Sequence, residues 1–278
     1  MYDIFSRAGQ VAPKHSFTWG RKKVAEEMPR LRPDTKYLGT YYDASVHNPE
    51  RLIMDLLTEG NDTGHGRSAN YLRVVGHNPE GVVLRDELTG KEFPFAADVV
   101  INATGNWVDP TNEALGQDTR LMGGTKGSHI VLDHPELLEA TRGREIFFEH
   151  EDGRIVLIYP MLGRVLVGTT DLNASPAEEP VCTDDEIEYF FDLIHHVFPD
   201  ITVQAKDIVY TFSGVRPLPR HDDTTPGSVS RDYSVKRHTE HGRTVFSLVG
   251  GKWTTFRALS EELADDALKA LRLSRTRS

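Results

Sequence analysis

The sequence contains very little cysteine: Cys182 is the only one in 278 residues. A single thiol cannot form a disulfide within the chain, and it excludes a zinc or iron–sulfur site built from cysteines. We expect no metal site. Proteins without disulfides are typical of a reducing compartment, and we therefore expect a cytoplasmic location.

Long apolar runs are also missing. The longest stretch without a charged side chain is ten residues, Val99–Val108, whereas a membrane-spanning helix needs roughly 18 or more apolar residues. The first residues, Met1–Phe5, have neither the basic region nor the apolar core of a secretory signal. We expect neither a membrane span nor export.

Positive charge is in deficit, with 32 basic against 42 acidic residues and a formal net charge of −10. This balance opposes a general affinity for nucleic acid, so we expect no nucleic-acid partner. An anionic ligand would have to be bound by local arginines. The clearest basic run, Lys269–Arg277, fits a solvated tail better than a contact with an anionic membrane surface.

The composition, 38% hydrophobic and 27% charged, is that of an ordinary globular protein of one or two domains. Apolar periodicity predicts a mixed α/β (α+β) fold with at least one antiparallel sheet. The run 97–103 has the continuous apolar character of a strand covered on both faces. Helices are predicted at 2–7, after Asn48–Pro49, from Asp184 to Phe198 and from Phe256 to Leu271. Strands are predicted at 36–42, 71–75, 82–85, 92–95, 97–103, 128–132, 145–149, 154–159, 164–169, 207–212, 230–237 and 244–249.

Two glycine-containing turns follow predicted strands. Ala103-Thr104-Gly105 would let a ligand approach the backbone at the carboxyl end of a strand, although a plain turn there is common. Gly250-Gly251-Lys252 precedes a helix, whose N-terminus attracts a phosphate or an electron-rich carbonyl. The alternative is an ordinary turn in which Thr254 or Thr255 caps the helix.

Arginine and histidine candidates lie near other strands. Pro217 keeps the backbone of Arg216 out of the helical region, and a guanidinium can hold a carboxylate or a phosphate with two hydrogen bonds. An ion pair between elements is the alternative for Arg216, and pairing with its own neighbouring acidic residues is the alternative for Arg231. His129 follows a predicted glycine-rich turn, Gly123–Gly127, and is either a general base or a structural residue. That turn lacks the spacing of a triphosphate-binding loop.

Six segments occur in order along the chain: Asn102–Trp107 (NATGNW), Lys126–His129 (KGSH), Gly168–Asp171 (GTTD), Ser213–Leu218 (SGVRPL), Ser230–Tyr233 (SRDY) and Gly250–Thr255 (GGKWTT). Taken together they are far more specific than any one of them. They resemble the FAD-dependent (aerobic-type) glycerol-3-phosphate dehydrogenases, which are flavoproteins of the D-amino-acid-oxidase-like superfamily. The resemblance extends from about Met1 to Leu268.

The resemblance implies an FAD-binding domain interleaved with an antiparallel-sheet substrate domain. Segments 46–107 and 244–278 would belong to the FAD domain, 108–243 to the substrate domain, and 1–45 would bridge the two. The family's G-x-G-x-x-G fingerprint follows no predicted strand here, which implies an FAD domain lacking its first βαβ unit and an N-terminally truncated chain. Asn106 and Trp253 stand where the family more often has proline and leucine.

The implied reaction is oxidation of sn-glycerol 3-phosphate to dihydroxyacetone phosphate, with hydride passing from C2 to FAD and electrons to a quinone. Arg216 and Arg231 would hold the substrate, with Arg216 nearest the reacting carbon. His129 would be the base, and Lys252 would stabilise the reduced flavin or accept the proton. The resemblance also suggests a peripheral position on the inner face of the cell membrane. The cofactor contacts would come from Ala103, Thr104, Gly105, Gly250, Gly251, Lys252, Thr254 and Thr255.

Two alternatives remain open on the sequence. A flavin-dependent enzyme acting on a 2-hydroxy or 2-amino acid would use Arg216 to hold a carboxylate. A fragment unable to hold FAD alone would be inactive, because the fingerprint that anchors the pyrophosphate is missing.

Overall fold

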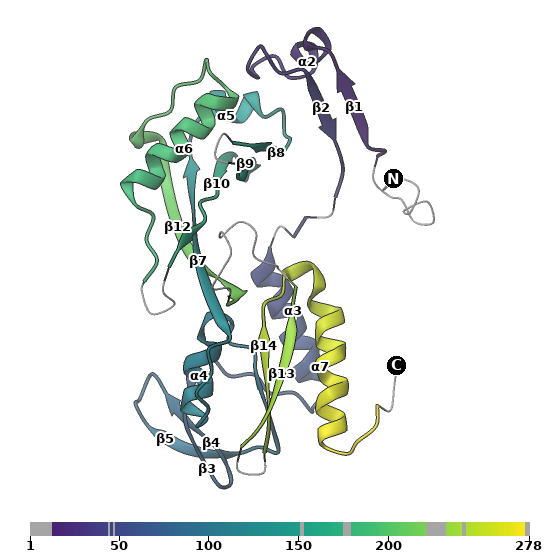
Figure 1. The fold of residues 1–278 in the computed structure, drawn as a ribbon, viewed down its shortest axis with the longest axis vertical. Helices are drawn as coiled ribbons and strands as arrows, with labels where there is room; N and C mark the ends of the chain where they lie inside the picture. Colours follow the sequence, from purple (N-terminus) through teal and green to yellow (C-terminus); the bar gives the residue numbers. More distant parts are fainter. Residues whose placement is uncertain are drawn as a thin grey trace.

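The computed structural model describes residues 13–43, 45–46, 48–150, 153–174, 179–220, 232–240 and 243–275. Two lobes lie one above the other in Figure 1, and a small hairpin stands beside the upper one. We call the upper lobe, built on a six-stranded sheet, the large-sheet lobe. The lower lobe contains a parallel strand pair, and we call it the parallel-strand lobe.

All pairings in the six-stranded sheet are antiparallel. Its two longest strands, β7 and β12, pair from Ile208 opposite Leu132 to Pro219 opposite Met122, with a register shift between Ile208 and Tyr210. On β7, residues 129–132 pair with β10, and 125–126 pair with the short β11. The strand bounds are β7 (Met122–Leu132), β8 (Ile146–Glu149), β9 (Ile155–Met161), β10 (Arg164–Gly168), β11 (Leu172–Asn173) and β12 (Ile208–Pro219).

Helix α6 (Asp184–Val197) supplies much of the large-sheet lobe's core, and the shorter α5 (Pro135–Ala140) contributes the buried Leu137. Phe190, Leu193 and Ile194 have no exposed surface, because an apolar face with helical spacing packs against the strands. Thr183 and Glu186 form a capping box at the start of α6, and the helix ends just before Pro199. The predicted helix is confirmed.

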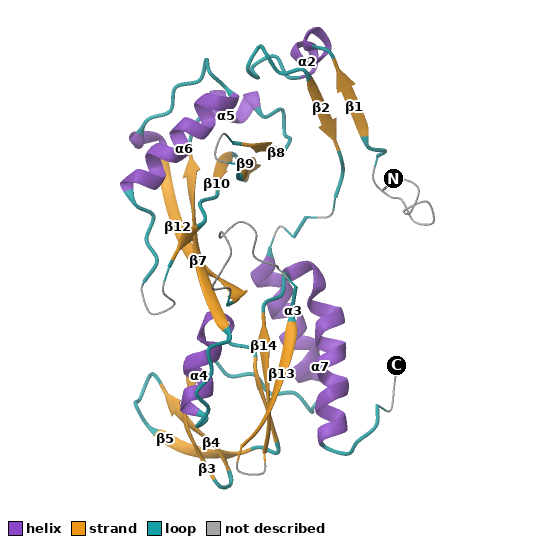
Figure 2. Ribbon diagram, in the orientation of Figure 1, coloured by secondary structure: helices purple, strands orange, loops and turns teal. Residues whose placement is uncertain are grey.

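The parallel-strand lobe is built around a three-stranded sheet. Strand β14 (Arg243–Val249) pairs parallel with β6 (Val99–Asn102) and antiparallel with β13 (Ser234–Glu240). Helix α7 (Phe256–Ala270) runs alongside β13 and β14 (Figure 2) and buries Leu259 and Leu263 against the lobe. The other elements here are α3 (Pro49–Asp62), β3 (Leu72–Asn78), β4 (Gly81–Asp86), β5 (Glu92–Ala96) and α4 (Val108–Ala114).

The prediction that the apolar run after residue 97 is covered on both faces is wrong. The side chain of Ile101 on β6 is 46% exposed. Among the described strands β6 pairs only with β14, so it is an edge strand with one open side. The apolar face of α3 is uncovered as well, with Ile53 and Leu57 exposed.

The hairpin beside the large-sheet lobe comprises β1 (Ser16–Trp19), α2 (Arg21–Glu27) and β2 (Tyr37–Thr40). Its Glu27 carboxylate pairs with Arg144 of the large-sheet lobe at 2.6 Å, and the backbone N–H of Arg32 donates to the carbonyl of Val197. The hairpin is therefore tied to the lobe. The helix predicted at 2–7 lies outside the described residues.

Two glycine-related predictions are corrected. The segment Gly123–Gly127 is part of strand β7 instead of a turn, and Ser213–Leu218 lies inside β12 instead of at a strand end. Glycine lowers strand propensity, which is why a turn was expected. Continuous pairing between β7 and β12 keeps both segments extended.

Strand pairing also bears on the predicted domain division. Both α4 and β13 lie within segment 108–243, yet β13 pairs with β14, and Asn112 of α4 accepts a hydrogen bond from Ser247 of β14 at 3.0 Å. These two elements thus belong structurally to the parallel-strand lobe. The domain boundaries remain a prediction.

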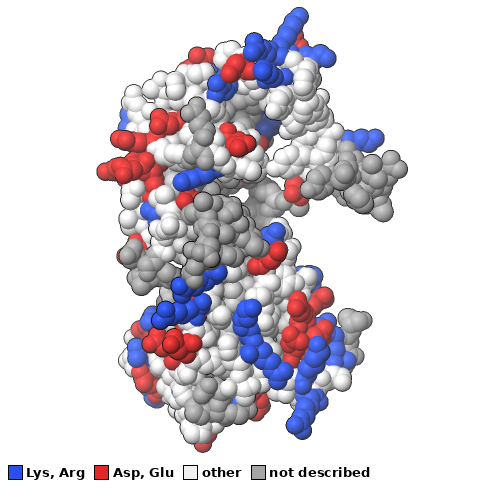
Figure 3. Space-filling view, viewed as in Figure 1, with Lys and Arg blue, Asp and Glu red and all other residues white. Residues whose placement is uncertain are grey.

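On the face shown in Figure 3, acidic and basic side chains are interspersed. Two residues of the basic C-terminal run pair with acidic residues of α7: Lys269 with Asp266 at 3.1 Å and Arg275 with Asp265 at 2.9 Å. These pairs reduce the net charge that this run offers to an anionic surface. In the described part of the chain, no helix is both long enough and apolar enough to cross a bilayer.

Two isoleucines on β9 allow a matched test of the core. Ile158 is fully buried, whereas Ile155 is 71% exposed. We expect Ile158→Ala to lower the free energy of unfolding by about 2–5 kcal/mol, because it leaves a cavity in the core. Ile155→Ala should change it by no more than about 0.5 kcal/mol. Denaturant unfolding followed by circular dichroism measures both, and equal losses would contradict this assignment of the core.

Candidate functional site

Three of the six sequence segments meet on the large sheet. Within the β7–β12 ladder, Ser213 lies opposite Ser128 and Arg216 opposite Thr125. The 168–171 segment begins at the end of β10, where Gly168 pairs with His129 of β7. Segments separated by about forty residues in the sequence therefore surround one position.

Arg216 is held firmly at this position. Its Nη1 donates to Asp171 Oδ1 at 3.1 Å, and its Nη2 donates to Thr169 Oγ1 at 2.8 Å and to the carbonyl of Thr170 at 3.0 Å. The side chain is 21% exposed, so a ligand can reach it. The ion pair that the sequence left as an alternative is present, and it coexists with this accessibility.

A glycine on β7 makes room for the guanidinium of Arg216. A Cβ atom built on Gly127 would overlap the guanidinium group. Only glycine therefore permits the observed position of Arg216.

His129 lies on the same strand as Gly127, two residues further on. Its ring stacks on Phe212 with the centroids 4.8 Å apart and the planes 10° from parallel. Nδ1 is buried and has no hydrogen-bond partner among the described residues. Burial, assisted by the charge of Arg216, lowers the pKa of His129 from 6.5 to about 4. The ring is thus neutral near pH 7 and able to accept a proton.

The two glycine turns predicted to contact a cofactor lie together at one edge of the parallel-strand lobe. Residues 103–105 follow β6, and residues 250–255 follow β14, so both leave the carboxyl ends of parallel strands. Buried side chains join the two strands: Asn102 Nδ2 donates to Asn112 Oδ1 at 2.8 Å, and Ser247 Oγ donates to the same oxygen at 3.0 Å.

The start of α7 differs from the capped turn that the sequence left as an alternative. A short 3₁₀ helix, η4 (Trp253–Thr255), precedes it, and neither Thr254 nor Thr255 caps α7 through its side chain. Thr255 Oγ1 donates instead to the carbonyl of Lys252 at 3.1 Å.

Strand β12 connects this edge to Arg216. The side-chain amide of Asn106 donates to the carbonyl of Val215, the residue before Arg216. A Cβ built on Gly105 would lie 3.7 Å from Pro217, and one on Gly250 would lie 3.4 Å from Pro219. The C-terminal half of β12 therefore packs against both glycine turns.

Not every predicted site residue joins this arrangement. The Lys252 side chain is exposed and makes no ion pair within the described residues. Arg231 lies outside the described residues. The sequence reasoning missed Glu186, which was taken only as an acidic residue in the first turn of a helix. The spacing Thr183-x-x-Glu186 signals a capping box and could have drawn attention to it.

Comparison with known proteins assigns the family. A family model described as "FAD dependent oxidoreductase" (DAO) matches residues 3–257. The chain belongs to this family. Its mixed α/β fold matches that of a solved FAD-bound structure, as described below.

Two relatives with similar sequences are named glycerol-3-phosphate dehydrogenase. The chain is 35% identical to a glycerol-3-phosphate dehydrogenase of Synechocystis, over 84% of this chain and 45% of the relative. It is 36% identical to a mitochondrial glycerol-3-phosphate dehydrogenase of Arabidopsis thaliana, over 99% of this chain and 44% of the relative. The chain thus spans about half the length of these relatives.

A solved structure agrees in fold. The glycerol-3-phosphate dehydrogenase of Bacillus halodurans, complexed with FAD, superposes with a TM-score of 0.75 at 23% identity. The match covers 95% of this chain and 53% of that one.

Two facing glycines allow a test of how Arg216 is held. In Gly127→Ala the new methyl group should displace the guanidinium, which is the free end of a flexible side chain, without unfolding the sheet. Gly214→Ala, directly opposite on β12, meets no atom within 4 Å and is the control. We expect faster modification of Arg216 by phenylglyoxal in Gly127→Ala only, measured by mass spectrometry. Equal rates in the two variants would contradict the packing of Arg216 over Gly127.

The lowered pKa of His129 predicts a pH dependence of stability. Between pH 6.5 and about 4 the unfolded chain binds a proton that the folded chain excludes, so the free energy of unfolding should fall as the pH falls. One such group contributes at most about 1.4 kcal/mol per pH unit. We expect His129→Gln to flatten this part of the profile, measured by urea unfolding at successive pH values. An unchanged profile would mean that His129 titrates normally.

Proposed function

We propose that this chain binds glycerol 3-phosphate and the ring end of FAD, and that it oxidises the C2 hydroxyl of that substrate. One observation carries the proposal. Arg216 and the neutral His129 lie close together on β12 and β7, and the same strand β12 packs against the two glycine turns. The names of the relatives support the choice of substrate.

The substrate's phosphate requires more than one cation in this proposal. Asp171 already neutralises part of the charge of Arg216 through their ion pair. A phosphate group bound beside Arg216 would therefore be held weakly by that residue alone. We assign Arg231 as the second cation, and Arg216 as the one nearest the reacting carbon.

His129 is the base in this proposal. A neutral imidazole can take the proton of the C2 hydroxyl, and the stack on Phe212 fixes the plane of the ring. Because its pKa is about 4, the ring holds the proton only briefly near pH 7 and must pass it on. Arg216 would stabilise negative charge developing on the substrate oxygen. Lys252 is the alternative proton acceptor, or it stabilises the reduced cofactor.

The glycine turns fit the ring end of FAD. Gly250 and Gly251 have φ of +76° and +111°, which L-residues with side chains rarely adopt, and their small size leaves backbone groups accessible. Asn106 Oδ1 is buried without a hydrogen-bond partner in the described structure. The residues that would hold the cofactor are Ala103, Thr104, Gly105, Gly250, Gly251, Lys252, Thr254 and Thr255. When bound, FAD would supply the hydride acceptor.

The pyrophosphate of FAD needs a binding site of its own. No G-x-G-x-x-G follows a strand in this sequence, so the helix N-terminus that usually binds it is missing from these residues. We therefore expect the chain alone to bind FAD weakly.

The proposal extends to a quinone as the final electron acceptor and to a peripheral position at the inner face of the cell membrane. Relatives named aerobic glycerol-3-phosphate dehydrogenase in Staphylococcus species support an electron acceptor used in aerobic growth.

The test is flavin reduction by substrate. The purified chain is titrated with FAD, followed by flavin fluorescence, and then mixed anaerobically with glycerol 3-phosphate. We expect weak FAD binding and loss of the visible flavin absorbance, and a soluble quinone should restore that absorbance. Arg216→Ala should lower kcat/KM about tenfold or more, since each lost charge-assisted hydrogen bond costs roughly 1.5–3 kcal/mol.

A control variant and alternative substrates distinguish the possible outcomes. Arg164→Ala removes an arginine of β10 whose side chain is 42% exposed, and it should leave turnover unchanged. Normal turnover in Arg216→Ala would remove Arg216 from the site. Reduction by lactate or alanine in place of glycerol 3-phosphate would favour a carboxylate substrate. Failure to bind FAD at any concentration would support the alternative of a fragment that cannot hold FAD alone.

A further inference from the structure

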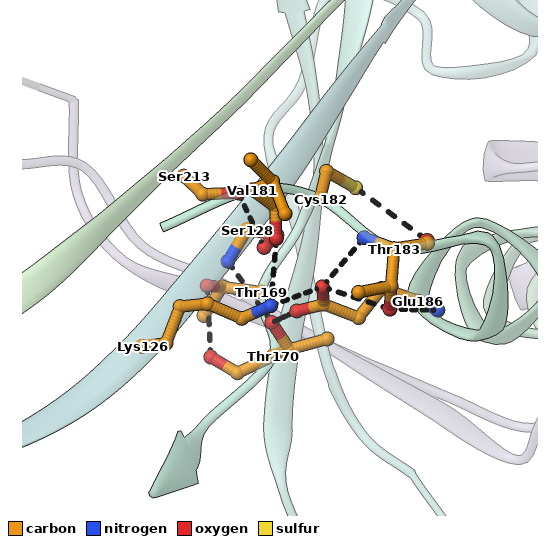
Figure 4. A network of polar contacts seen from close by, with 9 residues as sticks. All are labelled: Lys126, Ser128, Thr169, Thr170, Val181, Cys182, Thr183, Glu186 and Ser213. Atoms are coloured by element: carbon orange, nitrogen blue, oxygen red, sulfur yellow. Dashed lines mark hydrogen bonds and ion pairs between the residues drawn. The ribbon is translucent and has the colours of Figure 1, made fainter. Parts of the chain in front are cut away.

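A buried ion pair lies next to the candidate site. Lys126 Nζ is 2.7 Å from Glu186 Oε2, and the two side chains are only 12% and 3% exposed. Figure 4 shows the polar contacts around the pair. Two charges removed from water are tolerated only when further hydrogen bonds satisfy them, so their partners matter.

The carboxylate of Glu186 accepts hydrogen bonds from three parts of the chain. Oε2 accepts from Lys126 Nζ and from the backbone N–H of Thr183, the latter at 2.9 Å. Oε1 accepts from Thr170 Oγ1 at 2.6 Å. Burial opposes ionisation, but the hydrogen bonds from Lys126 and Thr170 outweigh it and lower the pKa of Glu186 to about 2. Glu186 is thus charged throughout the neutral pH range.

Thr170 transmits this anchoring to the turn after β10. Its hydroxyl donates to Glu186 and accepts from the backbone N–H of Ser128 at 2.9 Å, and the residue is 2% exposed. Both hydrogen-bonding roles of the hydroxyl are therefore used. The turn is fixed to β7 on one side and to the start of α6 on the other.

The same turn holds the guanidinium of Arg216. The carbonyl of Thr170 and the hydroxyl of Thr169 both accept from Arg216 Nη2. Glu186 thus holds Thr170 by its side chain, while Arg216 contacts Thr170 by its backbone. The Thr169–Thr170 turn therefore links the Lys126–Glu186 pair to Arg216.

We propose that Lys126 and Glu186 are positioning residues: their ion pair fixes the Thr169–Thr170 turn and thereby orients Arg216 toward glycerol 3-phosphate. This inference rests on the proposed function.

Helix capping alone does not require this arrangement. A glutamate in a capping box needs only the N–H of the capping residue, and such glutamates work at exposed helix ends. Here Glu186 also binds a largely buried lysine and a threonine from other elements. Buried ion pairs add little net stability compared with apolar residues of similar size, so stability does not account for this one.

The experiment uses a double-mutant cycle. Glu186→Gln and Arg216→Ala are made singly and together in the FAD-supplemented chain, and calorimetry measures the Kd of glycerol 3-phosphate. We expect Glu186→Gln to weaken binding about tenfold in the unsubstituted background, because small misplacements of a binding group are costly. In the Arg216→Ala background it should weaken binding no further. Asp133→Asn, which breaks an exposed ion pair with Arg164, should not change the Kd.

An apolar pair separates positioning from stability. Lys126→Met combined with Glu186→Leu fills the same space without charge and should unfold at a temperature close to that of the unsubstituted chain. We expect it to bind glycerol 3-phosphate as weakly as Glu186→Gln. Binding at the unsubstituted affinity would overturn the inference, as would an equal effect of Glu186→Gln in both backgrounds of the cycle.

A readout without substrate distinguishes this inference from the proposed function. If the unsubstituted chain does not bind glycerol 3-phosphate, the proposed function fails. Modification of Arg216 by phenylglyoxal still reports its orientation in that case. We expect it to be faster in Glu186→Gln and in the apolar pair than in Asp133→Asn, and equal rates would overturn the inference.

Discussion

The pairing of β7 with β12 is the constraint on which the rest of the site depends. This ladder places Arg216 opposite Thr125, directly before the KGSH segment, and lets its guanidinium pass over Gly127, which has no side chain. Shifting the pairing by one residue would turn Arg216 to the opposite face of the sheet. The same ladder extends the proline-containing end of β12 to the parallel-strand lobe, so one pair of strands determines both ends of the site.

Buried polar groups fix the backbone at both ends of the site in similar ways. At the lower end, Asn102, Asn112 and Ser247 join the parallel strands through hydrogen bonds between residues with almost no exposed surface. At the upper end, Thr170 links a turn to a buried carboxylate. A buried polar group left without a partner costs free energy, so each network restricts the backbone to a narrow set of positions.

Helices and strands were largely predictable from the sequence, because their apolar residues recur with helical or alternating spacing. The α6 helix followed from Ile187, Phe190 and Ile194, and the structure confirms it. Residues 123–127 were mistaken for a turn, since glycine favours turns wherever no neighbouring strand is known. The exposure of Ile101 was also unpredictable, because burial depends on which elements pack against a strand.

The candidate site was predictable only in part. The motifs and their order pointed to the family, and the family model confirms that assignment. The closeness of Arg216 to His129 depends on strand register, and no local pattern encodes it. Glu186 was overlooked because an acidic residue in a first helical turn has a sufficient local explanation, whereas its partners Lys126 and Thr170 are distant in the sequence.

The hydrogen bond from Asn106 to the backbone beside Arg216 has a thermodynamic consequence. It joins the turn after β6 to the strand that carries the arginine, so a ligand that displaced either one would also act on the other. Such coupling is reciprocal. If one ligand changes the affinity for a second by some factor, the second changes the affinity for the first by the same factor. If the proposed substrate and cofactor both bind, their affinities would therefore be coupled.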